Sequence, residues 1–403
     1  MVNRAVAACL AAIVFAGPAV AAAPPPQPKT GPGSSLDATT DVVKRAVGRA
    51  SALTYAYHLA STPASPRSVV VLLHGWGAVN PVVYGGWIEH LVRRGHLVLF
   101  PSFQTVGRTR PGEATDVSAD LIKSALAELA SDPQAKPDPK KLAYLGHSAG
   151  SGIAANLAAT SRERGLPAPK LLYLTMPGGI AKDEASRGVV LADLSRIDPD
   201  TAIVTMVGDR EFQAAERLSR RILKEASGVP QTRKLFMRSA SDDHGFPALS
   251  ATLSSPASPM EGYDPAAIKV PPDPPADPKA RPQRPKWNAD MVLSGEQTVL
   301  LNQLQRNVTD TLDYLAYWKT FDMALATAFA DGDMAALRAD ASFLDMGRWT
   351  DGWPVRRMTA EIPKAAEASS GGAAPAAAAA AAAAPVIQSK LPVTRRTNAR
   401  KAR

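Results

Sequence analysis

Hydrophobic residues along this chain form short, nearly continuous runs that alternate with longer stretches of helical spacing. Between residues 41 and 239, apolar runs predict strands at 53–59, 68–73, 96–100, 141–145, 170–175, 202–207 and 234–238. Stretches with apolar residues three and four positions apart predict helices at 82–93, 115–130, 150–162 and 212–226. Apolar strands separated by helices predict an α/β fold, with a mostly parallel sheet covered by helices on both faces.

After residue 247 the pattern changes to a proline-dense stretch that continues to about residue 290 and includes VPPDPPADPKARPQRPK. Proline has no amide hydrogen to donate, so we expect residues 247–290 to form a surface excursion outside the sheet. Ser294 is a suitable helix N-cap with Gln297 three residues later, and the apolar spacing beyond it predicts a helical closing segment over 294–330, with a break inside. We therefore expect one folded domain over residues 41–363.

Both ends of the chain differ in composition from this domain. Arg4, an apolar run over 5–16 and small residues up to Ala23 predict a cleavable signal peptide over 1–23, too short to cross a bilayer, which takes about 20 apolar residues. The Pro/Gly-rich residues 24–40 predict a flexible linker, and the Ala/Pro-rich, then basic, residues 364–403 predict a disordered tail. We expect a periplasmic or secreted protein without disulfides, since the only cysteine, Cys9, lies in the signal peptide.

The net charge of +9 does not indicate a nucleic-acid-binding protein, because much of it lies in the C-terminal tail. Six of the positive charges lie in the last fourteen residues, and removing these six from +9 leaves +3 for the rest of the chain. We therefore expect no nucleic-acid partner, and at most a weak contact between the tail and anionic surfaces. Nothing in the composition indicates an oligomer, and we expect a monomer.

The sequence GHSAG, residues 146–150, lies between a predicted strand and a predicted helix. This is the context that the G-x-S-x-G pattern requires, because a tight strand-to-helix turn lifts the serine hydroxyl above the sheet edge. Glycines are needed two residues to either side, where side chains would collide with the neighbouring strand and helix. Ser148 is therefore a candidate nucleophile.

A serine hydroxyl needs a base to become a nucleophile. Where a serine occupies such a turn, the chain order is serine, acid, histidine. Only His244 follows Ser148 among the six histidines, which are His58, His74, His90, His96, His147 and His244. His244 lies in a turn-rich loop after the strand at 234–238, from which we expect it to reach Ser148. The strand at 202–207 precedes two candidate acids, Asp209 and Glu211, and the spacing after the glycine slightly favours Glu211.

Acyl transfer also requires two backbone N–H groups that bind the oxyanion. Ala149 begins the helix after the nucleophile and supplies one. The other is expected from the glycine-containing loop after the strand at 68–73, where Trp76 is the first choice and Gly77 the second. No phosphate-binding or dinucleotide-binding pattern and no metal-ligand spacing occurs in the sequence, so we expect neither a cofactor nor a metal.

Four segments, in their order along the chain, resemble the motifs of the α/β-hydrolase family of serine esterases and lipases: VLLHGWG, GHSAG, VGDRE and DDHG. YLAYWKTFDMALATAF is similar to the closing helix of secreted bacterial members near the dienelactone hydrolase and cutinase-like branch. The resemblance implies an α/β-hydrolase fold with about eight strands and an acyl-enzyme mechanism. Dienelactone hydrolases use cysteine as the nucleophile, whereas Ser148 favours an esterase, and a cutinase is less favoured because disulfides are absent.

The sequence thus predicts an exported serine hydrolase that cleaves small or polymeric carboxylic esters. A peptidase, a thioesterase or an acyltransferase of the same fold would use the same residues, so these remain alternatives. A further alternative is a non-catalytic envelope-binding protein built on the hydrolase fold.

Overall fold

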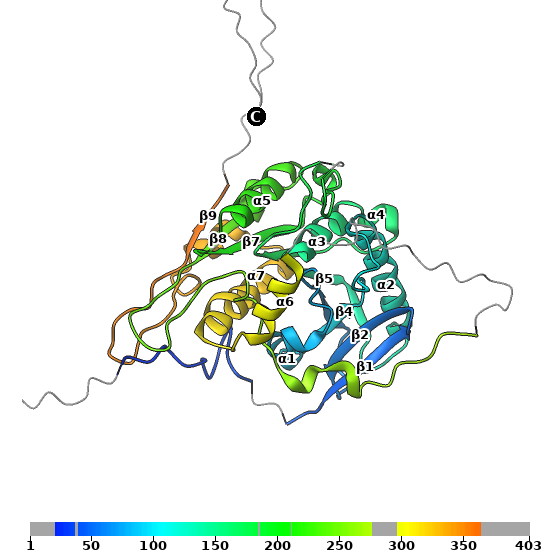
Figure 1. Ribbon diagram of the computed structural model, residues 1–403, viewed down its shortest axis with the longest axis horizontal. Helices are drawn as coiled ribbons and strands as arrows, with labels where there is room; N and C mark the ends of the chain where they lie inside the picture. The colour runs from blue at the N-terminus through cyan, green and yellow to red at the C-terminus, as the bar shows by residue number, and fades with distance from the viewer. Residues whose placement is uncertain (1–20, 37–38, 184–185, 211, 276–295, 364–403) are drawn as a thin grey trace, which may run out of the picture. The chain divides into compact units, whose positions relative to one another are not determined.

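The computed structural model describes residues 21–36, 39–183, 186–210, 212–275 and 296–363. Within these residues a nine-stranded sheet has the order β1-β2-β4-β3-β5-β6-β7-β8-β9 (Figure 1). Its strands are β1 (Val42–Arg49), β2 (Ala52–Leu59), β3 (Arg67–Leu73), β4 (Leu97–Pro101), β5 (Pro137–His147), β6 (Leu171–Thr175), β7 (Ala202–Gly208), β8 (Lys234–Ser239) and β9 (Thr359–Glu361). The six central strands, β4 to β8 with β3, run parallel, while β1, β2 and β9 pair antiparallel at the two edges.

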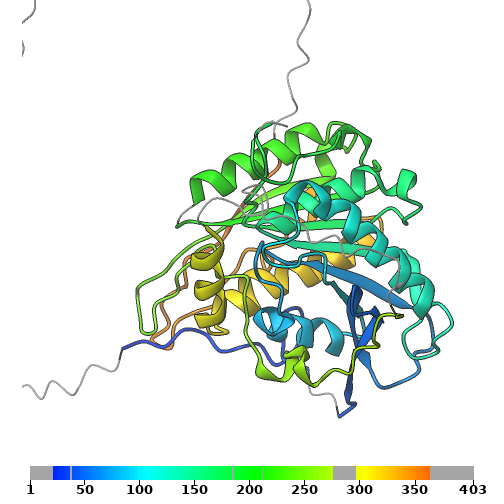
Figure 2. The ribbon, with the colours of Figure 1, turned by 45° about the vertical axis from the view of Figure 1, so that its right-hand side comes forward.

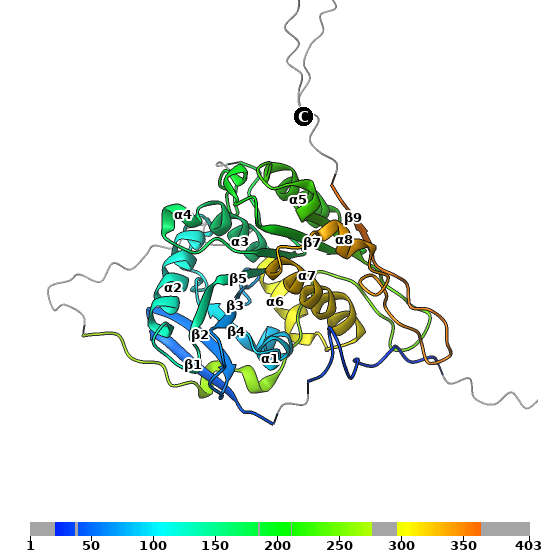
Figure 3. The same cartoon turned by 180° about the vertical axis from the view of Figure 1, so that it is seen from behind.

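Helices cover both faces of the sheet, as the alternation of strands and helices predicts. One face carries α2 (Ala114–Leu129), the short α4 (Ser161–Arg164), α3 (Ala149–Ala159) and α5 (Phe212–Glu225). On the other lie α1 (Gly85–Arg93), α6 (Glu296–Arg306), a π-helix η8 (Leu312–Trp318) and α7 (Lys319–Phe329), with α8 (Met334–Ala339) after them (Figures 1 and 3). Alternate residues of each central strand enter the two cores: Val69 and Val71 of β3 pack under α2 and α3, and Val70 and Leu72 under α1 and α7.

The predicted strands and helices are present, with shifted ends. The closing segment has its expected break between α6 and η8, and the cyan α1 and yellow α6–α7 helices lie together on one side of the sheet (Figure 2). The pattern did not reveal β1 or β9. Both are edge strands with mostly half-exposed or exposed side chains, so neither has the continuous apolar run of a central strand.

The segment after β8 crosses the carboxyl ends of the strands. An isolated bridge joins Asp242 to Leu249, and we call the segment between them the 242–249 hairpin. The chain then passes over the end of β7, where the Ala251 carbonyl accepts from Arg210 N, and continues through the 3-10 turns η5 (Glu261–Tyr263) and η6 (Pro265–Ala267). Leu249, Ala251, Ala257 and Tyr263 are buried, so the first part of the expected surface excursion belongs to the core. Residues 276–290 of that excursion lie outside the described residues.

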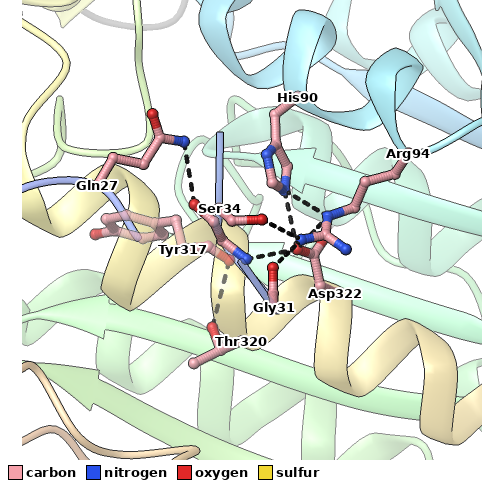
Figure 4. A network of polar contacts seen from close by, with 9 residues as sticks. Gln27, Gly31, Ser34, His90, Arg94, Tyr317, Thr320 and Asp322 are labelled. Atoms are coloured by element: carbon pink, nitrogen blue, oxygen red, sulfur yellow. Dashed lines mark hydrogen bonds and ion pairs between the residues drawn. The ribbon is translucent and has the colours of Figure 1, made fainter. Parts of the chain in front are cut away.

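The expected linker also packs against the domain. Figure 4 shows the buried Asp322 carboxylate of α7, which accepts hydrogen bonds from Gly33 N at 2.8 Å and from His90 Nε2 at 2.9 Å, and pairs with Arg94 Nε at 2.7 Å. Arg94 also donates to the Gly31 carbonyl. The Asp322 carboxylate is 5% exposed, and its bond to Gly33 N, with the bond from Arg94 to the Gly31 carbonyl, ties residues 31–34 to the helical layer.

Candidate active site

Ser148 occupies a strained turn between β5 and α3. Its backbone has φ 51° and ψ −118°, a conformation that costs a non-glycine residue about 1–3 kcal/mol. Ser148 N donates to the Thr175 carbonyl of β6 at 3.0 Å. A Cβ on Gly150 would lie 1.9 Å from the Leu73 carbonyl oxygen, so only glycine lets α3 start directly against β3. The turn is therefore the one that the sequence pattern predicts.

The Ser148 hydroxyl lies in a confined, slightly exposed position. Ser148 is 6% exposed, and its Oγ forms no hydrogen bond with any described residue. The loop after β6 passes beside it, where a Cβ built on Gly178 would lie 2.9 Å from the oxygen. Sequence reasoning missed Gly178, although two glycines following the strand at 170–175 are a sign of close backbone approach.

The backbone amides that are candidates for binding the oxyanion differ in whether they already donate a hydrogen bond. Ala149 N is at the first position of α3, where no helical carbonyl precedes it and the helix dipole favours an anion. Gly77 N donates to Gln104 Oε1 at 2.7 Å, so this amide is occupied. Trp76 N makes no hydrogen bond to a described residue, and the first-choice pair of Trp76 and Ala149 remains.

Of the two candidate acids, Asp209 lies within the described residues. Glu211 lies outside the described residues. Asp209 follows β7 as expected, but its carboxylate accepts from Ser241 N at 2.9 Å and from Ser241 Oγ at 2.5 Å. Asp209 therefore holds the start of the loop that carries His244, and it makes no hydrogen bond to the His244 ring.

His244 has other partners than the ones expected. Its Nε2 pairs with Asp351 Oδ2 at 2.7 Å, and its ring stacks on Trp353 with centroids 5.6 Å apart and planes 15° apart. No hydrogen bond joins the ring to Ser148 across the part of the chain that the structure describes. The expected contact between Ser148 and His244 is thus not formed in this conformation.

The C-terminal segment explains where His244 lies. Asp242, at the base of the 242–249 hairpin, accepts from Trp349 Nε1 at 3.2 Å and from Arg356 N at 2.8 Å. These contacts hold the hairpin beside residues 349–356. Asp351 was missed because nothing in the sequence around it marks a partner for a histidine 107 residues away.

The strand order and the position of Ser148 can now be compared with known proteins. A sequence model of the family described as the alpha/beta hydrolase fold matches residues 68–165, from β3 to the end of α4. The chain has the α/β-hydrolase fold. The nine strands observed are close to the number expected from the resemblance.

Solved structures similar to this hydrolase-fold chain include several esterases. Carboxyl esterase 2 of the fungus Tuber melanosporum is 19% identical, with 51% of this chain and 79% of that chain covered and a TM-score of 0.37. The esterase of the archaeon Pyrobaculum calidifontis is 18% identical, with 50% and 74% covered and a TM-score of 0.37. A thermostable esterase from Pseudomonas putida is 14% identical, with 52% and 75% covered and a TM-score of 0.36. No curated protein sequence matches this chain.

The described residues of this hydrolase fold contain no group of three or more His, Cys, Asp or Glu side chains able to hold a metal ion. A helix with the length and apolar character needed to span a membrane is likewise not found among them. At the Ser148 turn, the described residues present a hydroxyl and the unbound backbone amides of Trp76 and Ala149.

Proposed function

We propose that this protein is a serine hydrolase that cleaves carboxylic esters, with Ser148 as the nucleophile. The observation that carries the proposal is the backbone of Ser148, held at φ 51° in the turn at the carboxyl end of β5. Strain of this kind persists where surrounding structure enforces it, and here it presents the hydroxyl next to the amide at the start of α3. Such an arrangement suits acyl transfer.

In the proposed reaction, His244 takes the Ser148 proton while Oγ bonds to the ester carbonyl carbon. The amides of Trp76 and Ala149 bind the oxyanion, and the tetrahedral intermediate expels the alkoxide, which takes the proton from His244. Water, deprotonated by His244, then attacks the acyl-enzyme, and the carboxylic acid leaves as Ser148 regains its proton. Asp209 or Glu211 would orient the imidazole.

This proposal requires His244 to leave Asp351. The pair is accessible to solvent, with side chains 30% and 47% exposed, and solvent screening makes such pairs weak. We infer that the His244 side chain and the residues next to it move when substrate binds and bring the imidazole to Ser148.

The pairing of His244 with Asp351 also favours a second candidate, a non-catalytic binding protein of the cell envelope. In that case the hairpin would stay where it is, and the basic tail would attach the protein weakly to anionic surfaces. A peptidase, a thioesterase and an acyltransferase are distinguished from an esterase by a panel of amide, thioester and ester substrates with added acceptor alcohols.

A fluorophosphonate probe with p-nitrophenyl acetate turnover separates the two candidates. We expect the wild-type protein to be labelled and to hydrolyse the ester, and Ser148→Ala to lose both while melting at nearly the same temperature. Ser195→Ala is the matched control, because Ser195 lies in the exposed 3-10 turn η3 (Leu194–Arg196) and bonds only locally to Asp193. Labelling that persists in Ser148→Ala, or its absence from the wild type, would reject the proposed function.

We further propose that the protein acts outside the cytoplasm, in the periplasm or after secretion, as a monomer without a cofactor or a nucleic-acid partner. Support comes from the predicted signal peptide over 1–23. Fractionation of cells that produce the full chain, with the N-terminal sequence of the mature form, tests this. A product that begins at Met1 in the cytoplasm would contradict it.

A further inference from the structure

A series of three hydrogen bonds, two of them buried and one partly buried, links the loop of the oxyanion candidates to the nucleophile turn. Gly75 N donates to Tyr84 Oη at 3.0 Å, Tyr84 Oη lies 2.8 Å from His147 Nδ1, and His147 Nε2 lies 2.9 Å from the Leu253 carbonyl oxygen. Tyr84 is the last residue of the 3-10 turn η1 (Pro81–Tyr84), and His147 directly precedes Ser148. Leu253 belongs to the segment that crosses the sheet after the 242–249 hairpin.

The direction of every bond in this chain is fixed by elementary chemistry. The Leu253 carbonyl only accepts, so His147 carries its proton on Nε2 and leaves Nδ1 as an acceptor. Tyr84 must then donate its hydroxyl hydrogen to Nδ1, while its oxygen accepts from Gly75. Only one arrangement of hydrogens satisfies all the donors and acceptors in these three hydrogen bonds. The bonds therefore fix the positions of the groups that they join.

Burial preserves this arrangement. Tyr84 is 1% exposed and His147 is 2% exposed. The loss of water around the imidazole lowers the pKa of His147 to about 4, so the ring stays neutral at ordinary pH and keeps Nδ1 free to accept. The adjoining His74 is neutral for the same reason and stacks on Phe103 with centroids 4.0 Å apart.

The hydrogen bonds through Tyr84 and His147 affect which backbone amides near Trp76 are free. The amide before it, Gly75 N, is bound by Tyr84, and the amide after it, Gly77 N, is bound by Gln104. Side chains therefore occupy the amides on both sides, and the Trp76 N–H between them is left available. We propose that Tyr84 and His147 are positioning residues that fix the Trp76 amide relative to Ser148. This inference rests on the proposed function.

The test compares variants that break the chain with variants that preserve it. In Tyr84→Phe the Gly75 amide and His147 Nδ1 lose their partners, and we expect kcat for p-nitrophenyl acetate to fall at least tenfold with KM within twofold. Removing an oxyanion donor outright costs about 10²–10³ in kcat, so a displaced donor should cost less. His147→Phe should have the same effect, and the double variant should be no worse than either single one, because the residues act as a unit.

Two variants serve as controls. His147→Gln supplies an amide oxygen to accept from Tyr84 and an amide N–H to donate to Leu253, so we expect it to keep most of kcat. Tyr144→Phe also removes a fully buried tyrosine hydroxyl, but that hydroxyl has no hydrogen-bond partner among the described residues, and kcat should not change. Rates are divided by the concentration of sites labelled by the fluorophosphonate, so partial unfolding does not count as lost catalysis.

The outcomes for the two proposals can be told apart. A wild-type protein that neither labels nor turns over ester rejects the proposed function. The positioning role is overturned if Tyr84→Phe keeps the wild-type kcat per labelled site, or if only KM changes. A readout independent of activity is the ¹⁵N NMR spectrum of His147, where we expect a protonated Nε2 and a bare Nδ1. The opposite tautomer in the wild type overturns the inference whatever the activity.

Discussion

Around Ser148, the missing side chains of two glycines are as important as the polar groups that are present. Gly150 lets α3 start against the Leu73 carbonyl, and Gly178 leaves the space beside the hydroxyl where a substrate carbonyl must come. At this scale the free amides of Trp76 and Ala149, together with the bound ones of Gly75 and Gly77, decide where an anion can be stabilised.

Gly178→Ala tests the space beside the nucleophile. The added methyl would lie 2.9 Å from Ser148 Oγ, too close for an approaching acyl group, while the backbone of Gly178 has a conformation open to alanine. We expect the fluorophosphonate labelling rate to fall at least tenfold, about 1.4 kcal/mol in the barrier, with the melting temperature little changed. A labelling rate equal to that of the wild type would show that substrate approaches Ser148 from another side.

At the scale of elements, the 242–249 hairpin determines whether the site can work. Asp209 and Asp242 hold its base through Ser241, Trp349 and the Arg356 amide. The His244 imidazole pairs with the exposed Asp351 carboxylate, stacks on the exposed Trp353 indole, and lies 5.7 Å from the buried Trp349 ring. Next to it, Phe246 N donates to the Ala22 carbonyl at 2.8 Å. The hairpin backbone is thus fixed at its base and at Phe246, whereas side-chain contacts alone hold the imidazole ring. The movement required is therefore one of the His244 side chain and the residues next to it.

The variant Asp351→Asn tests whether the Asp351–His244 pair belongs to a resting conformation or to the catalytic one. If Asp351 holds His244 away from Ser148, removing its charge releases the imidazole. Because an exposed ion pair is weak, we expect kcat/KM for p-nitrophenyl acetate to stay the same or rise up to about fivefold. His244→Asn, by contrast, should lose more than a hundredfold. If Asp351→Asn is as inactive as His244→Asn, Asp351 is the orienting acid of the working site.

For the whole molecule, buried neutral histidines make stability depend on pH. Desolvation lowers the pKa values of His74 and His147 to about 4, against 6.5 for an exposed histidine. Above pH 6.5 both the folded and the unfolded forms are neutral, and stability is full. As the pH falls from 6.5 towards 4, the unfolded chain takes up protons that the folded one refuses, so stability is lost.

We therefore expect the unfolding free energy to fall between pH 7.5 and pH 4.5 by about 2 kcal/mol for each of these two histidines. Urea titrations at the two pH values measure it. Glutamine does not titrate in this range, so His147→Gln should show a smaller loss than the wild type by that amount. Equal pH dependence in the two proteins would mean that His147 is charged in the fold.

Local patterns predicted most of the fold and the turn that carries Ser148. Apolar runs marked the central strands, because a parallel strand covered on both faces must be apolar throughout. GHSAG predicted the turn at Ser148, since close contacts between neighbouring segments exclude every residue but glycine at its ends. The edge strand β1 was missed because Lys44 and Arg45, which point to opposite faces of the strand, interrupt its run of apolar residues.

What the sequence by itself determined is which central strands and helices form and which groups are candidates for chemistry: a hydroxyl in a strained turn, a single histidine after it, and amides beside glycines. Only the tertiary structure decided which groups meet. Tyr84 and His147 are 63 residues apart, His244 and Asp351 are 107 apart, and Gly33 and Asp322 are 289 apart. Such pairs form where loops of no regular period come together. The position of each loop depends on the packing of the whole domain, and no local pattern records it.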